Sequence, residues 1–125
     1  MDQIQEAKRY LDNAREILSE KARKENGYYQ DPKYVKMAGN TAYNGILVAL
    51  DSILDDKSKG RKDVKWYKEK LAKMDKKLLD SFVAAYNTLH LALGYDGNTL
   101  ASVAAAGIKE AEKIIDWVEQ RMALA

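Results

Sequence analysis

Apolar residues recur along the first half of the chain at spacings of three and four, which is the period of one face of an α-helix. Charged residues fill most of the positions between them from residue 2 to residue 26. Asp31-Pro32 then opens a second stripe, because Asp accepts free amides of a first helical turn and Pro suits its first position. We therefore expect two amphipathic helices, the first of which ends at Gly27. The stripes are Ile4, Ala7, Leu11, Ala14, Leu18 and Ala22, and then Val35, Ala38, Ala42, Gly45, Ile46, Ala49 and Ile53.

The second half of the chain starts with a polar segment, residues 55–62, which contains Gly60 and is expected to form a loop. Asp63 precedes a short amphipathic pattern, and Asp75 precedes a longer one that runs to Leu93. Both aspartates are suited to cap the first turn of a helix. A short helix followed by a long one fits this pattern, and so does a single kinked helix.

A last helix follows the turn Gly94-Tyr95-Asp96-Gly97, and Asn98 is expected to cap it. Four long helices with short connections favour an antiparallel four-helix bundle, because short loops cannot cross the bundle. The segment after Asp63 supplies one short extra helix. No segment shows the two-residue period that predicts a β-strand. The sequence thus predicts an all-α fold with a single domain, residues 1–125.

Composition narrows the chemistry that the chain can perform. Hydrophobic residues make up 46% of the sequence and charged residues 32%, which excludes a disordered chain. Cysteine is absent and His90 is the single histidine, so thiolate chemistry and a two-histidine metal site are excluded. We expect no cofactor and no metal. The polar start and the lack of a long apolar run predict a cytoplasmic chain that does not enter a membrane.

The charges are nearly balanced overall but unevenly distributed. The net charge is +2, so nucleic acid is not an expected partner on this ground. The stretch from Lys57 to Lys77 contains ten Lys and Arg residues and three acids. The stretch from Leu78 to the end contains three Lys and Arg residues and six acids. The simplest interpretation of the basic stretch is a solvated helix face.

Polar residues on two helices form a candidate cluster. Histidine is the residue type best suited to acid–base catalysis near neutral pH, but no Asp or Glu lies one turn away from His90 to orient its ring. We therefore assign no catalytic residue and expect no enzyme. A small polar pocket and a hydrogen-bonded network that fixes helix register both remain open. The cluster consists of Asn40, Tyr43, Asn44, Tyr86 and His90.

A stretch without charges suggests a binding surface. No charged residue occurs between Asp80 and Asp96, and the last helix begins with many alanines. If the outer faces of these two helices are adjacent, they form a flat apolar patch on which a protein partner or a second copy can dock closely. The alternative is that the alanines only favour helix formation. The patch residues are Val83, Ala84, Asn87, Thr88, Leu91, Ala101, Ser102 and Ala105.

Three segments, residues 27–45, 86–91 and 94–98, resemble a small uncharacterised family of bacterial helical proteins. Its layout is similar to the HEPN helical bundles, some of which are RNases or partners of nucleotidyltransferases. The HEPN catalytic pattern places an Arg four to six residues before a His, where this chain has Ala84, Ala85 and Tyr86. RNase activity by that mechanism is therefore not expected.

These observations lead to a main hypothesis and two alternatives. The main hypothesis is a non-enzymatic protein-binding module that uses the apolar patch; its uncharged face also suggests an engineered surface on a natural scaffold. One alternative is a homodimer through the same patch. The other is a HEPN-like, RNA- or nucleotide-associated protein that uses His90, Asn87, Tyr86 and the basic residues Arg61, Lys62, Lys65 and Lys68.

Overall fold

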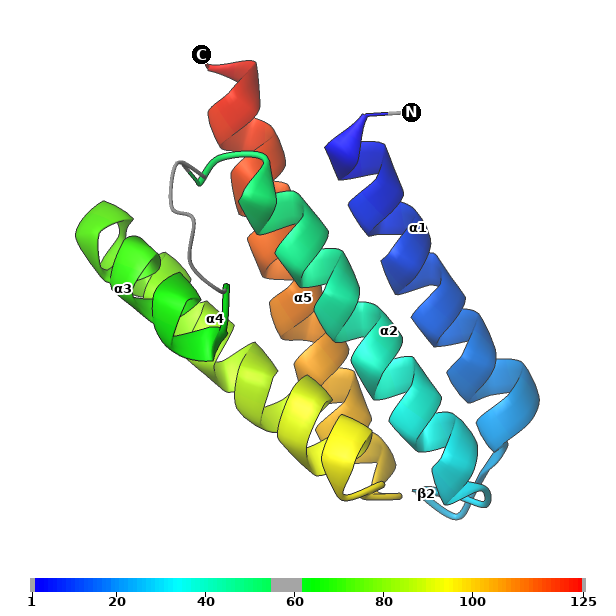
Figure 1. Cartoon of the computed structure of the whole chain (residues 1–125). Coiled ribbons are helices and arrows are strands. Elements are labelled where there is room, and N and C mark those ends of the chain that lie inside the picture. The colour runs from blue at the N-terminus through cyan, green and yellow to red at the C-terminus, as the bar shows by residue number, and fades with distance from the viewer. Residues whose placement is uncertain (1, 55–61, 125) are drawn as a thin grey trace.

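The computed structural model describes residues 2–54 and 62–124 and is mostly helical (Figure 1). The expected loop around Gly60 therefore lies outside the described residues, apart from Lys62. A small antiparallel hairpin joins the first two long helices. In chain order the elements are α1 (Gln3–Glu16), η1 (Ile17–Ala22), β1 (Lys24–Glu25), β2 (Tyr28–Tyr29), α2 (Pro32–Asp51), α3 (Val64–Met74), α4 (Lys76–Ala85), η2 (Tyr86–Tyr95) and α5 (Ala101–Ala123).

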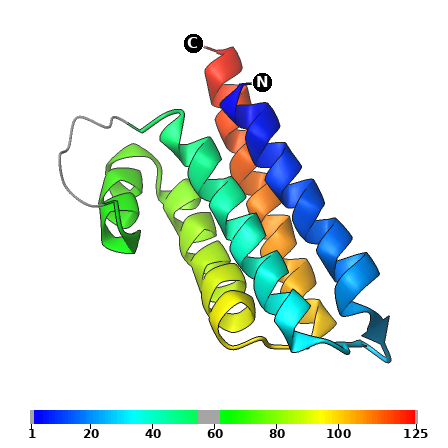
Figure 2. The ribbon, with the colours of Figure 1, turned by 45° about the vertical axis from the view of Figure 1, so that its right-hand side comes forward.

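The long helical segments lie side by side (Figures 1 and 2). The wider π-helical turns of η1 continue α1, and those of η2 continue α4. Helix α2 packs against α1, η2 and α5, and α5 also packs against α4 and α1. Helix α3 packs on α4 at the outside (Figure 2). The prediction of a helical fold is confirmed.

Aspartate side chains start three of the helices as predicted. Asp31 accepts a hydrogen bond from the amide of Lys33 at 3.1 Å, and Pro32 is the first residue of α2. Asp63 and Asp75 cap α3 and α4, each across a distance of 2.9 Å. Asp75 itself has an extended backbone, with φ −163° and ψ 123°. The chain is therefore broken there, and a short helix is followed by a long one.

Three local predictions were wrong. The first helical segment ends at Ala22 and not at Gly27, because the chain leaves the helix at Arg23 and enters the hairpin. Asn98 does not cap α5: the N-cap residue is Leu100, and the Asn98 Oδ1 atom accepts a hydrogen bond from its amide at 2.9 Å. The hairpin was not predicted at all. Its turn is Asn26-Gly27, with positive φ angles of 53° and 83°, a geometry that Asn and Gly adopt readily.

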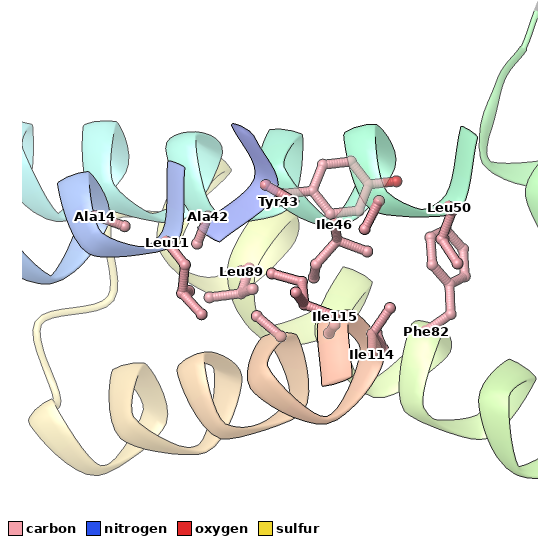
Figure 3. Packing of buried hydrophobic residues seen from close by; sticks show 14 of the residues in the cluster. Leu11, Ala14, Ala42, Tyr43, Ile46, Leu50, Phe82, Leu89, Ile114 and Ile115 are labelled. Atoms are coloured by element: carbon pink, nitrogen blue, oxygen red, sulfur yellow. The ribbon is translucent and has the colours of Figure 1, made fainter. Parts of the chain in front are cut away.

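The apolar stripes meet in one core between the long helices. Every predicted stripe residue of the first helix is buried. Figure 3 shows Ile46 of α2, Leu89 of η2 and Ile114 of α5 in the packed interior. All three are fully buried, and burial of such a side chain contributes about 1.5–3 kcal/mol to the free energy of unfolding.

Two glycines let the helices approach η2 closely. A Cβ atom on Gly39 of α2 would lie 2.5 Å from the carbonyl oxygen of Leu89 and 2.6 Å from the Cβ of Leu93. A Cβ atom on Gly107 of α5 would lie 2.6 Å from the Cδ2 of Leu89. A side chain at Gly39 would therefore push α2 away from η2, whereas a side chain at Gly107 would have to displace the side chains of Leu89 and Thr88.

The substitution Gly39→Ala should lower the free energy of unfolding by about 2 kcal/mol, because overpacking outweighs the gain of about 1 kcal/mol in helix propensity. Urea unfolding followed by circular dichroism measures this. Asn44→Ala, at an exposed position of the same helix, is the control and should be neutral or slightly stabilising. A Gly39→Ala variant as stable as the parent chain would show that the close approach of α2 to η2 is not a constraint.

Candidate functional site

The structure places the predicted patch on two flanks of α5. On one flank, a Cβ atom on Gly107 would lie 2.8 Å from the Oγ1 atom of Thr88, so Thr88 sits at the contact between η2 and α5. On the other flank, Ala101 and Ala105 line a groove with residues of η1 and β2. Gly107 and Ala105 are two positions apart, which is about 200° around a helix. The predicted set therefore does not form one continuous patch.

The other predicted patch residues lie on the elements where they were expected. Val83 and Ala84 are half-buried on α4, and Asn87 is exposed on η2. Leu91 of η2 is exposed over 36% of its surface, and Ser102 is exposed on α5. Ala105 is exposed in the groove, whereas Ala101 is half-buried.

The groove beside α5, which we call the alanine groove, has a volume of about 730 Å³. This volume lies in the range typical of ligand sites. Three alanine side chains of α5 form one wall, because their single methyl groups leave the space unfilled. Its apolar lining consists of Leu18, Tyr29, Ala101, Ala104, Ala105 and Ile108.

The charged lining of the alanine groove is positive overall. The Arg15 guanidinium forms ion pairs with Glu112 and with Asp12, so the charge of Glu112 is already compensated. Lys24 and Lys109 also line the groove. Neither lysine makes an ion pair with any residue in the part of the chain that the structure describes. The groove thus combines an apolar surface with two uncompensated cations, a combination that suits an apolar group carrying negative charge.

The hairpin closes one side of the alanine groove. The amide of Tyr29 donates to the carbonyl of Thr99 at 2.8 Å, and the amide of Ala101 donates to the carbonyl of Gly27 at 2.9 Å. Tyr28 also forms a β-bridge with Leu100. These bonds fix β2 against the start of α5 and hold the Tyr29 ring in the groove. Burial raises the pKa of the Tyr29 phenol above its usual value of 10.0.

The predicted polar cluster is mainly a stack of rings. The Tyr43 ring lies 4.9 Å from the His90 ring and 5.9 Å from the Tyr86 ring, centroid to centroid, and Tyr86 lies 5.3 Å from His90. The His90 Nδ1 atom is buried and has no hydrogen-bond partner among the described residues. Asn40 instead donates to the carbonyl of Gly94 at 3.4 Å, and Asn44 is exposed.

Part of the basic stretch reaches this ring stack. The Nζ atom of Lys68 lies 5.6 Å from the centroid of the Tyr86 ring, and Lys62 and Lys70 lie 5.4 and 5.7 Å from that of Trp66. Arg61 lies outside the described residues.

Within residues 2–54 and 62–124, no group of three or more His, Asp or Glu side chains is placed to hold a metal ion. No helix in these ranges combines the length and apolar character needed to cross a membrane.

Most residues that line the alanine groove were missed by the sequence analysis. They are Arg15, Ser19, Lys24, Tyr29, Ala104, Ile108, Lys109 and Glu112, and Leu18 was assigned only to the apolar stripe. The signal that could have indicated them is Asn26-Gly27, a strong hairpin dipeptide. A hairpin at this point returns the chain toward the first helix and brings Tyr29 beside the alanines.

Comparisons with known proteins place the chain among proteins of unknown function. A family described as a domain of unknown function, DUF5618, matches residues 2–120. The solved structure of a protein of unknown function from Dyadobacter fermentans is 58% identical to this chain and has a TM-score of 0.92. That match covers 95% of each chain. No curated protein matches the sequence.

The burial of Tyr43 in the ring stack predicts how the free energy of unfolding changes at alkaline pH. Burial, with a smaller contribution from the nearby Tyr86, raises the pKa of Tyr43 from 10.0 to about 12. Because the folded pKa lies above the unfolded one, the stabilisation by neutral Tyr43 is complete below pH 10 and is lost as the pH rises to 12. Its size is at most about 2.7 kcal/mol.

The variant Tyr43→Phe should therefore lose less stability than the parent chain between pH 10 and pH 12. It should also lack the latest step in a titration of phenolate absorbance. Tyr95→Phe, at a ring that is 77% exposed, is the control and should keep that step. Identical titration curves for the parent chain and Tyr43→Phe would contradict the burial of Tyr43.

Proposed function

The chain belongs to the DUF5618 family of unknown function, and from its alanine groove we propose that it is a non-enzymatic protein-binding module. The observation that carries this proposal is the exposed apolar groove beside α5, which lies next to two lysines without ion-pair partners among the described residues. Exposed apolar surface bordered by polar groups is typical of protein interaction sites.

The lining of the groove defines the chemistry of the partner. The methyl groups of Ala101 and Ala105 leave room for a large side chain such as Leu or Phe. Lys24 and Lys109 attract carboxylates beside that side chain, and desolvation in the groove strengthens this attraction. We therefore infer a partner segment with one apolar anchor flanked by Asp or Glu residues.

In this proposal the long segments α1–η1, α2, α4–η2 and α5 act as an antiparallel four-helix bundle, and α3 is the short extra helix. Residues of α1, η1, the hairpin and α5 line the groove. A site on packed helices needs little ordering when the partner binds, which favours affinity. An extended segment and a short helix are both compatible with an open groove of this volume.

The other hypotheses stay predictions. A homodimer would use the same groove on a second copy, so sedimentation velocity of the chain alone distinguishes it from the proposed module. The HEPN-like, RNA- or nucleotide-associated alternative uses His90, whose ring packs against the rings of Tyr43 and Tyr86. The hypothesis of an engineered scaffold likewise stays a prediction, and so does a cytoplasmic location.

A pair of neighbouring alanines tests the proposed function. Ala105 and Ala106 are both exposed on α5, but only Ala105 lines the alanine groove. A peptide-display selection on the immobilised chain should enrich segments with an apolar anchor and flanking acids. Ala105→Glu should weaken the binding of these peptides at least 30-fold in calorimetry, because it places a carboxylate where the partner's acids bind.

Ala106→Glu is the matched control, with the same helix, exposure and change in charge. It should change the dissociation constant less than about twofold, because it lies outside the groove. Thermal unfolding of both variants should match that of the parent chain. Equal binding by the parent chain and Ala105→Glu, or a selection that enriches no peptide over the Ala105→Glu surface, would overturn the proposal.

A further inference from the structure

Helix α3 and the start of α4 carry six lysines without acidic partners. None of them makes an ion pair with another residue in the ranges 2–54 and 62–124. Two of the three acids in this stretch, Asp63 and Asp75, direct their carboxylates to the amides that they cap. The carboxylates of Asp63 and Glu69 are exposed, and these few acids offset only part of the positive charge. The lysines are Lys65, Lys68, Lys70, Lys73, Lys76 and Lys77.

Three of these lysines are unfavourable for the helices that carry them. Lys65 lies in the first turn of α3, and Lys76 and Lys77 lie in the first turn of α4; neither first turn contains an acid. Cations near a helix N-terminus are repelled by the positive end of the helix dipole. Helix stability therefore does not explain these positions, whereas an anionic ligand would compensate the charge of the lysines.

From this surface we propose a second binding function: the lysines of α3 and α4 bind the phosphate backbone of nucleic acid, at a site separate from the alanine groove. Helix α3 lies at the outside of the molecule (Figure 2), so its exposed side is open to a long polyanion. The small net charge of the whole chain does not reveal this surface, because its six lysines are concentrated within thirteen residues.

The same residues define how the nucleic acid is bound. Lys70 and Lys62 lie over the Trp66 ring, and Lys68 lies over the Tyr86 ring, so these faces are occupied by cations rather than open to bases. Binding is therefore through phosphate and independent of base sequence.

A membrane surface fits less well than nucleic acid. Basic membrane-binding helices combine lysines with large apolar side chains that insert into the lipid. Among the described residues, the large hydrophobic side chains that are exposed lie at Tyr28, Met37, Leu91, Tyr95, Leu100, Met122 and Leu124. All of these lie outside α3 and α4. In the described residues of α3 and α4, the lysines are therefore not accompanied by an exposed large apolar side chain that could insert into lipid.

Fluorescence anisotropy with a labelled single-stranded oligouridylate of about 20 nucleotides tests the proposal at 50 and 200 mM salt. With four or more lysines contacting phosphates, affinity should fall by about 50-fold or more over this range. The triple variant Lys65→Glu, Lys73→Glu and Lys76→Glu changes exposed residues of the surface and should abolish binding at both concentrations.

The control is Lys21→Glu, Lys33→Glu and Lys36→Glu, which changes three exposed lysines elsewhere and gives the same net charge. It should keep most of the affinity. Absence of binding at 50 mM salt, or equal loss in the two triple variants, would overturn the proposal. So would equally tight binding to phosphatidylserine vesicles or to polyglutamate, because the surface would then attract any polyanion. Peptide binding in the alanine groove is measured separately and should be the same in both triple variants.

Discussion

The size of the side chain at each helix contact determines where this protein is closely packed and where it is open. Gly39 of α2 and Gly107 of α5 have no side chain, and both helices come within contact distance of the η2 backbone or side chains. On the other flank of α5 the small residues Ala101 and Ala105 line the alanine groove. Small residues of α5 therefore allow close packing against η2 on one flank and leave the alanine groove unfilled on the other.

The hairpin turns this open flank into a defined site. Hydrogen bonds from Tyr29 to Thr99 and from Ala101 to Gly27 fix the hairpin against the start of α5. Tyr29 then lines the groove together with the alanines, and Lys24 of β1 brings a positive charge to it. Two strands of two residues each contribute little to the core, but they supply both an apolar and a charged part of the candidate site.

The sequence predicted those parts of the fold that depend on neighbouring residues. The apolar stripe from Ile4 to Ala22 is buried, and the caps at Asp31, Asp63 and Asp75 form as expected. Such signals are local, because a cap involves only residues two or three positions apart. Asn98 was misassigned because an Asn side chain can accept from the amide two residues further along, here that of Leu100, instead of capping the helix.

The candidate site was predicted less well than the helices. Ala101 and Ala105 were correctly placed outside the main core stripe, but the sequence could not show which neighbour each flank of α5 would meet. That choice depends on the rotation of α5 between α1 and η2, which is set by distant contacts such as that of Gly107 with Leu89. The π-helical turns of η2 change the direction in which the side chains around His90 point. We recognised no local sequence signal for these turns.

The most direct test of the account is the change in backbone amide chemical shifts when a selected acidic-apolar peptide is added to the isotope-labelled chain. If the alanine groove binds the peptide, the largest changes should fall in residues 101–109, in η1 and at Tyr29. Largest changes in α3 or on the η2 flank around Asn87 would contradict the central claim, because they would place the partner on a different surface.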